Sequence, residues 1–180
     1  GENELTRGPA MTFPYNTEQR AAIGQAMAEA RSLKSRAERP GSLAVTEIML
    51  TELHAAAVSA FVRHQGIPRG DIEVVGFHGQ PVLHRADEGL PVQLGDGGLL
   101  AELAGLTVVH DLRARDVDAG GQGAPLVPVY HRALVAGIAQ RPIAVVNIGG
   151  GANVTCIGSD DTLIAFDTGP GNALLDDWMM

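Results

Sequence analysis

Glycine is distributed unevenly along the sequence, and this feature most restricts the possible fold. Residues 1–65 contain four glycines, whereas residues 66–180 contain nineteen. Glycine weakens the interior of helices and strands, and it is favoured in tight turns and wherever backbone must approach a neighbour closely. We therefore expect a helical first third, followed by short strands that alternate with glycine-bearing loops.

Two apolar patterns of helical period occupy the first third. One helix is predicted to begin at a cap formed by Asn16 or Thr17 and to end before Pro40, with its apolar face made of Ile23, Met27, Ala30 and Leu33. A second is predicted over residues 46–65 and stops at Gly66 and Pro68, with its apolar face made of Leu50, Leu53, Ala57 and Phe61. Both helices are expected to pack in the core.

Short β-branched runs replace this pattern after residue 71. Strands are predicted at 72–77, 106–112, 143–148 and 163–166, and helices at 99–104, 126–139 and 172–180. This alternation predicts an α/β fold, in which ligands bind at loops beyond the carboxyl ends of strands. The predicted organisation is a mainly helical segment over 1–70, followed by two segments of strands and glycine-bearing loops over 71–142 and 143–180.

Composition excludes several classes of protein. The formal charge of −8 and the 4% aromatic content argue against a nucleic-acid partner, because such a surface repels phosphates and offers few stacking platforms. The single cysteine, Cys156, rules out a disulfide framework and a Cys-cluster zinc site, and it indicates a reducing compartment. The longest apolar runs reach about half of the ~18 residues needed to span a membrane. We expect a cytoplasmic protein with no membrane partner.

Charged residues and glycines are concentrated in residues 111–125. Three carboxylates (Asp111, Asp116 and Asp118) lie among two arginines and three glycines. A carboxylate here could act as general base on a hydroxyl or water, and an arginine could keep it ionised or bind phosphate. The alternative is a glycine-rich turn with surface ion pairs worth about 0–1 kcal/mol each. The residues alone leave both interpretations open.

Two further glycine loops could contact a phosphate. Residues 147–155 read as a strand, a triple-glycine turn and a second strand, in which exposed N–H groups could hold phosphate oxygens or simply form a hairpin. The segment is neither a P-loop nor a dinucleotide fingerprint. Residues 167–172 place a carboxylate at a strand end before a helix, which suits a sugar hydroxyl, a phosphate or a metal-bound water, or merely a capped turn.

A polar group follows the first predicted strand. His78 and Gln80, with His84 nearby, could hydrogen-bond a polyhydroxyl ligand, although a structural histidine explains the pattern equally well. No third ligand completes a metal site in this stretch, and no metal-binding residues are assigned. The sequence also lacks a Gly-x-Ser-x-Gly elbow, and no histidine is near Cys156, which disfavours acyl transfer.

Taken together, these loops resemble one family, the anhydro-N-acetylmuramic acid kinases of the superfamily that contains actin, sugar kinases and heat-shock chaperones. The resemblance rests on five motifs in the same order, together with His131: GFHGQ with His84 (76–84), VQLGD (92–96), DLRARDVDAGGQGAPLVP (111–128), NIGGGANVT (147–155) and FDTGPGNALLD (166–176). It implies a partial actin/hexokinase-like (ribonuclease H-like) α/β fold with a mixed sheet and flanking helices.

The resemblance also implies an activity. Such kinases use ATP and Mg²⁺ to convert 1,6-anhydro-N-acetylmuramic acid and water into N-acetylmuramate 6-phosphate in peptidoglycan recycling. It assigns residues 71–142 to the sugar site and the catalytic base, and residues 143–180 to the second phosphate loop and the start of the following nucleotide-binding half. It places the catalytic base at Asp116. It places the sugar site at His78, Gly79, Gln80, Asp111, Arg113 and Asp167. It places the phosphate contacts at Asn147, Gly149, Gly150, Gly151, Asn153, Gly169 and Gly171. A homodimer is left open as a partner arrangement.

The sequence also departs from the family pattern. Phe77 and Pro81 stand where Ser and Thr are usual, and Gly151 stands where a bulky apolar residue is usual. The first phosphate loop and the adenosine-binding half of the family are missing, so the 180 residues are interpreted as an internal piece with little activity alone. Two alternatives remain: a kinase for another sugar, and a non-catalytic sugar-binding module that has lost its nucleotide half.

Overall fold

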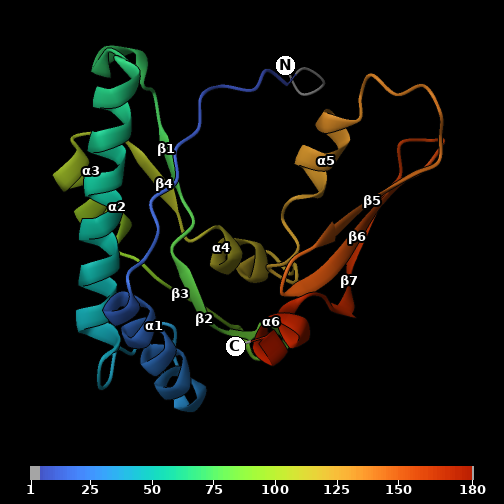
Figure 1. The fold of residues 1–180 in the computed structure, drawn as a ribbon. Helices are drawn as coiled ribbons and strands as arrows, with labels where there is room; N and C mark the ends of the chain where they lie inside the picture. Colours follow the sequence, from blue (N-terminus) through green and yellow to red (C-terminus); the bar gives the residue numbers. More distant parts are fainter. Residues whose placement is uncertain (1–4, 180) are drawn as a thin grey trace. The chain divides into compact units, whose positions relative to one another are not determined.

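The chain folds into two compact units with both helices and strands. A computed structural model describes residues 5–179, and Figure 1 shows their helices and strands. Among these residues, one unit comprises 9–123, and the other comprises 124–179 together with 5–8. Parallel and antiparallel strand pairs both occur among the described residues, which confirms the mixed α/β class. The three-segment functional organisation stays a prediction.

The first helix of the larger unit, α1 (Thr17–Glu29), begins with a reciprocal cap. The side chain of Asn16 accepts the N–H of Gln19, and the side chain of Gln19 accepts the N–H of Asn16, each at 2.8 Å. The helix buries Ile23 and Ala26, and a 3₁₀ turn (Ala30–Ser32) follows. The predicted start is confirmed. The prediction for Met27 is wrong: its side chain is 45% exposed, because Ala26 takes the inward position beside Ile23.

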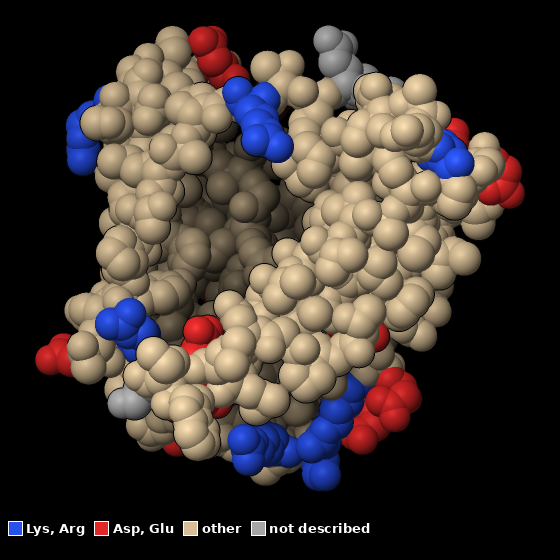
Figure 2. Space-filling view, turned by 45° about the vertical axis from the view of Figure 1, so that its right-hand side comes forward, with Lys and Arg blue, Asp and Glu red and all other residues tan. Residues whose placement is uncertain are grey.

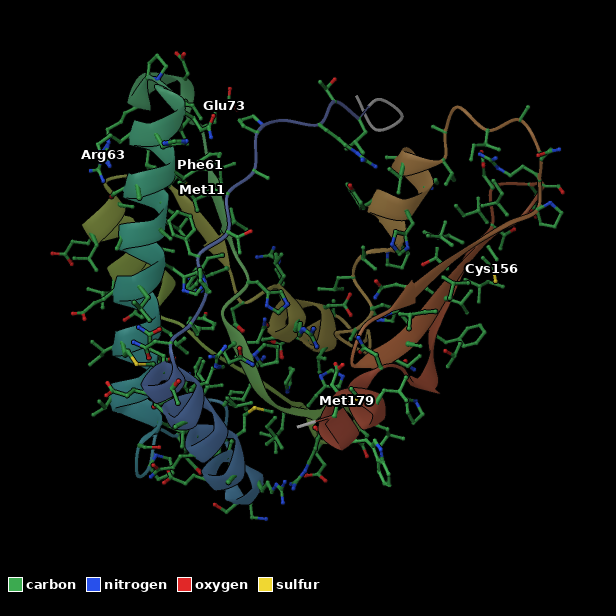
Figure 3. All side chains as sticks on the ribbon, in the orientation of Figure 1. Met11, Phe61, Arg63, Glu73, Cys156 and Met179 are labelled. Atoms are coloured by element: carbon green, nitrogen blue, oxygen red, sulfur yellow. The ribbon has the colours of Figure 1, made fainter. Side chains whose placement is uncertain are left out.

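Helix α2 (Leu43–Gln65) is the long element of this unit. It begins three residues earlier than predicted, and it ends as predicted at Gly66, which adopts the left-handed conformation at φ 64°. Leu43 and Leu50 lie in the main core with residues of α1, β2 and β3. Leu53, Ala57 and Phe61, which were predicted to be core residues, are only half-buried. Figure 3 shows Phe61 on the side of α2 where Met11 of the extended N-terminal segment lies.

Helix α2 is also long and apolar enough to cross a membrane by length and composition. The length of its apolar runs did not indicate this, because polar residues interrupt them. Core helices of soluble proteins pass the same test. Here α2 packs against α1, α3 and β3, and it carries Glu47 in an ion pair with Arg39.

The strands of the larger unit form two pairs. β1 (Val75–Phe77) pairs in parallel with β4 (Val108–His110), and β2 (Gln80–Arg85) pairs antiparallel with β3 (Leu90–Leu94). Helix α3 (Gly97–Ala104) connects β3 to β4, and 3₁₀ turns occupy Arg69–Asp71 and Ala86–Glu88. β1 and β4 are shorter than the predicted strands. The β2–β3 hairpin was not predicted, because Pro81 and the glycines at 79 and 89 read as loop.

Helix α4 (Leu112–Asp118) corrects the interpretation of residues 111–125 as one glycine-rich turn. The charged half of that segment is helical, and only the glycines after residue 119 form the turn. Arginine and leucine have high helix propensity, and the glycines end the helix. The regular helix therefore fixes the directions in which the aspartates and arginines of the segment project.

The smaller unit is a three-stranded antiparallel sheet with two short helices. β5 (Ile143–Ile148) occupies the predicted residues, and β6 (Gly151–Ile157) lies between it and β7 (Leu163–Pro170). β7 runs four residues further than predicted. Helix α5 (Pro128–Leu134) is shorter than predicted, and α6 (Ala173–Met179) begins one residue late. The predicted end of α6 at Met180 lies outside the described residues.

The two faces of this sheet differ. One face carries the buried Thr155 and Ile157, and α5 contacts it through His131, whose Nδ1 lies 2.8 Å from the Thr155 hydroxyl. The opposite face carries exposed apolar side chains, including Val146, Ile148, Ile164 and Phe166. Cys156, labelled in Figure 3, pairs with Ile164 in the register of β6 and β7.

Candidate functional site

A pocket of about 270 Å³ lies where the two parallel strands end. Phe77 of β1 pairs with His110 of β4, so the residues that follow these strands are neighbours. His78 and Gly79 after β1, and Asp111 after β4, line the pocket. A ligand site was predicted at the carboxyl ends of strands, and this pocket lies there.

Close backbone packing shapes the pocket. A Cβ on Gly79 would lie 2.6 Å from the carbonyl oxygen of Leu94, and Gly79 has φ 66°. A Cβ on Gly97 would lie 2.1 Å from the imidazole of His110. Contacts this short would force neighbouring atoms to move. Glycine at both positions therefore allows the pocket walls to pack this closely.

Asp111 is held in an unusual backbone conformation. It precedes α4 with φ 54° and ψ 38°, in the left-handed region that non-glycine residues seldom adopt. Such conformations cost about 1–3 kcal/mol and often occur at functional sites. The conformation places Asp111 at the junction between β4 and α4, where it lines the pocket beside His110.

Asp116 lies further along α4 and is not among the residues that line this pocket. It lies five positions after Asp111, which corresponds to roughly 7.5 Å along a helix axis. Its Oδ2 atom accepts the N–H of Gly123 at 2.8 Å, and the N–H of Gly121 donates to its main-chain oxygen at 2.8 Å. The glycine turn therefore folds around the half-buried carboxylate and fixes its position.

The remaining predicted sugar-site residues of this unit lie outside the pocket lining. Gln80 belongs to β2, where its Nε2 donates to the carbonyl oxygen of Pro81 at 3.1 Å. Arg113 is half-buried on α4. His84, which belongs to the same motif as His78, is exposed on β2 close to Gly123.

Several pocket residues were missed by sequence reasoning. The only sequence signal for Gln93, Gly95 and Asp96 was their place in the VQLGD motif of the family. Arg39, Glu47, Gly97 and His110 were not singled out at all. Arg39 and Glu47 precede the motif-bearing part of the sequence by about thirty residues or more, and only the packing of α2 against β3 brings them to the pocket. No sequence pattern signals that contact.

In the smaller unit, the sheet register brings three predicted residues into one row. Asn147 pairs with Asn153, and Asn153 pairs with Asp167. Directly paired residues project from the same face of a sheet. The register shifts beyond this row, and Thr168 in the shifted segment donates its hydroxyl to the carbonyl oxygen of Ala152 at 3.1 Å. The side-chain oxygen of Asn153 is buried and has no hydrogen-bond partner among the described residues.

The triple-glycine turn packs on the start of α6. The N–H of Gly171 donates to the carbonyl oxygen of Gly150, and the N–H of Asn172 donates to that of Gly149, each at 2.8 Å. A Cβ on Gly171 would lie 2.1 Å from the Gly149 oxygen. Two of the loops predicted to contact phosphate are therefore joined through their backbones. Gly169, which belongs to the second of these loops, lies on β7 with φ 138°.

Charge is dispersed on the surface drawn in Figure 2. Lysine and arginine side chains there stand among acidic and uncharged residues. Among the described residues, no group of three or more His, Cys, Asp or Glu side chains is arranged to hold a metal ion. The pocket at β1 and β4 is lined by side chains that can donate hydrogen bonds and by side chains that can accept them.

Comparison with known proteins gives a consistent result. The family model for anhydro-N-acetylmuramic acid kinase matches residues 2–180. A protein of that name from Brucella canis is 50% identical over 182 residues, which cover 99% of this chain and 49% of its own length. Relatives of the same name from Nitrobacter winogradskyi and Rhodopseudomonas palustris are 52% and 53% identical over 181 residues, with 50% of each covered. The chain spans about half the length of these relatives.

Proposed function

Because the chain belongs to the anhydro-N-acetylmuramic acid kinase family, we propose that the natural full-length protein phosphorylates 1,6-anhydro-N-acetylmuramic acid. The products would be N-acetylmuramate 6-phosphate and ADP, with one water consumed. The observation that carries the proposal is the pocket at the ends of β1 and β4, beside the helix that bears Asp116. The role would belong to cytoplasmic recycling of peptidoglycan.

Asp116 is assigned as the general base. The water oxygen attacks the anomeric carbon and the bond from that carbon to O6 breaks. O6 takes the γ-phosphoryl group as the bond to ADP breaks, and the water proton passes to the Asp116 carboxylate. The N–H of Gly123 supports this role, because one hydrogen bond orients Oδ2 while the other oxygen can accept a proton. Positioning of this kind is the main contribution a kinase makes.

The sugar is assigned to the pocket. His78, Gly79 and Asp111 line it and supply groups that can donate to and accept from hydroxyls. Gln80 and Arg113 lie on the adjoining β2 and α4, and we assign them to the outer part of the sugar site. Phe77 is buried and forms part of the pocket lining, so its difference from the usual family residue changes the pocket wall.

The phosphates of ATP are assigned to Asn147, Asn153 and residues 149–151, together with Gly169 and Gly171. The carbonyl oxygens of Gly149 and Gly150 accept from residues 171–172, so these partial negative charges are turned toward the protein. This arrangement fits an anionic ligand. Asp167, which the resemblance placed in the sugar site, pairs with Asn153 in the sheet. Its carboxylate and the unpartnered Asn153 oxygen fit Mg²⁺, an ion that proteins often hold with one or two carboxylates plus phosphate oxygens. Bound Mg²⁺ would neutralise charge on the transferring phosphoryl group.

The test is Asp116→Asn in the natural full-length protein. Removal of a general base should lower kcat by about 10²–10⁴-fold, while calorimetry should show sugar affinity within a few-fold of wild type. Asp118→Asn is the matched control, because Asp118 lies on the same helix and its exposed carboxylate only pairs with Arg36. An Asp116→Asn enzyme with wild-type turnover would refute the assignment. A wild-type protein that phosphorylates ordinary hexoses but not the anhydro-sugar would refute the proposed substrate.

A further inference from the structure

The loop between β3 and α3 forms one wall of the pocket, and its position is tightly confined. Gly95, Asp96 and Gly97 all line the pocket. A Cβ on Gly95, which has φ 146°, would lie 2.6 Å from the ring of Phe77, and one on Gly97 would lie 2.1 Å from the ring of His110. The loop is therefore fitted between two rings, and a shift of a few tenths of an ångström would alter the shape of the pocket.

Helix α2 holds this loop from the side through two hydrogen bonds. The Oε1 atom of Glu47 accepts the N–H of Gly95, and the hydroxyl oxygen of Thr51 accepts the N–H of Asp96, each at 3.0 Å. Thr51 is fully buried, and its hydroxyl donates to the carbonyl oxygen of Glu47 at 2.7 Å. Glu47 and Thr51 are one helical turn apart, so both bonds come from the same face of α2.

Arg39 fixes the direction of the Glu47 carboxylate. Its Nε and Nη2 atoms donate to Oε2 and Oε1 of Glu47, each at 2.9 Å, in the two-point geometry that makes such pairs strong. Its Nη1 atom donates to the carbonyl oxygens of Arg36 and Glu38 at 2.6 and 2.9 Å. The two side chains are only 23% and 18% exposed, so solvent screens the pair incompletely.

We propose that Arg39 and Glu47 are positioning residues, which act through Gly95 and Asp96 to set the shape of the sugar pocket. This inference rests on the proposed function for its consequence. Arg39 and Glu47 also line the pocket, but their charged groups are paired with each other and with backbone groups, so we place their effect on the ligand in the loop. The catalytic base lies on α4, outside this set of contacts. Weakening the pair should therefore raise KM for the sugar and leave kcat and KM for ATP close to wild type.

The variants separate the two points of attachment. Glu47→Gln keeps an oxygen for Gly95 but loses the charge that Arg39 requires, and Arg39→Lys loses the two-point geometry. Thr51→Val removes the oxygen that accepts the N–H of Asp96, with little change in side-chain shape. Thr51→Ser keeps this hydroxyl and should behave like wild type. Glu88→Gln is the control, because it breaks the exposed Arg85–Glu88 pair outside the pocket lining.

The experiment measures steady-state kinetics and amide hydrogen exchange in the natural full-length protein. Misplacement of a binding loop by up to about 1 Å can cost as much as 10²-fold in kcat/KM. We expect Glu47→Gln, Arg39→Lys and Thr51→Val to raise the sugar KM by about tenfold or more, with kcat within about twofold. The amides of Gly95 and Asp96 should also exchange faster in these variants, and Thr51→Ser and Glu88→Gln should match wild type.

Several results would overturn the inference: an unchanged sugar KM, a fall in kcat alone, unchanged exchange at Gly95 and Asp96, or equal effects of the Val and Ser variants at position 51. If Glu47→Gln does not fold, the comparison at Thr51 decides. If the wild-type protein phosphorylates no sugar, the proposed function fails. In that case hydrogen exchange at Gly95 and Asp96 still decides whether Glu47 and Thr51 hold the loop.

Discussion

The position of Asp116 is set by backbone groups. Its carboxylate accepts the N–H of Gly123, and Gly121 packs so closely that a Cβ there would lie 2.1 Å from Oδ2. A carboxylate that is fixed by an N–H donor and a glycine contact keeps its direction without an arginine partner. The glycines after α4 are therefore required for the geometry of the proposed base, in addition to closing a turn.

Gly121→Ala tests this steric requirement. The new methyl group should displace the Asp116 carboxylate, so kcat should fall by at least about tenfold, toward the level of Asp116→Asn. Circular dichroism should show that the fold is retained. Gly137→Ala is the control, because nothing lies within 4 Å of a Cβ at that position. Wild-type kcat in Gly121→Ala would show that the carboxylate does not depend on this contact.

At the scale of elements, Glu29 joins the end of α1 to the start of α2. Its carboxylate accepts from the side chain of Gln25 at 2.8 Å, and from the main-chain N–H and hydroxyl of Ser42 at 2.7 and 2.8 Å. The hydrogen bond from Gln25, followed by those from Ser42, lowers the pKa of Glu29 from its ordinary value of 4.5. These bonds favour the charged form, so the connection depends on ionisation.

Stability should follow the charge of Glu29. A carboxyl group whose pKa is lower in the folded state stabilises the fold above its unfolded pKa, and this contribution is lost as pH falls through the folded pKa. Glu29→Gln should therefore lower the urea midpoint at pH 7, and its difference from wild type should shrink below about pH 4.5. Glu52→Gln, at an exposed position on α2, is the control. A difference that does not change with pH would contradict the role of charge.

Helix α5 is attached to the sheet of the smaller unit by a buried polar contact. His131 and Thr155 are 7% and 0% exposed, and His131 Nδ1 lies 2.8 Å from the Thr155 hydroxyl. Thr155→Val keeps the shape but leaves the imidazole without its partner, which should lower the free energy of unfolding by about 1–3 kcal/mol. Thr168→Val, which removes an exposed hydrogen bond, should change it by less than about 0.5 kcal/mol. Equal effects in denaturant titrations would argue against the buried contact.

At the scale of the whole molecule, the chain spans about half the length of its relatives. Phosphoryl transfer needs groups that hold both substrates in line, and the described residues contain a candidate sugar pocket and a candidate phosphate turn. We therefore expect the 180 residues alone to give less than about 1% of the kcat/KM of the natural full-length protein, a loss of the size that misplaced reactants can produce. A coupled assay for ADP measures this, and comparable rates would contradict it.

The candidate site was predictable in part. Residues next to each other in sequence, such as His78 and Gly79 after β1, were found because a glycine loop after a buried strand is a local signal. Arg39 and Glu47 were not found, because their place at the pocket depends on which face of α2 meets β3. Met27 was misassigned for a similar reason: helical period alone does not say which of two adjacent positions, 26 or 27, turns inward.

Local chemistry in the sequence determined the cap at Asn16, the end of α2 at Gly66, the β5–β6 hairpin and the mixed α/β class, because each depends on residues within a few positions of one another. The motifs likewise identified the family. Tertiary structure decided that Asn147, Asn153 and Asp167 share a row, and that α2 supports the pocket loop. Strand register and the rotation of a helix about its axis are set by packing between distant segments. They therefore cannot be predicted from residues that are neighbours in the sequence.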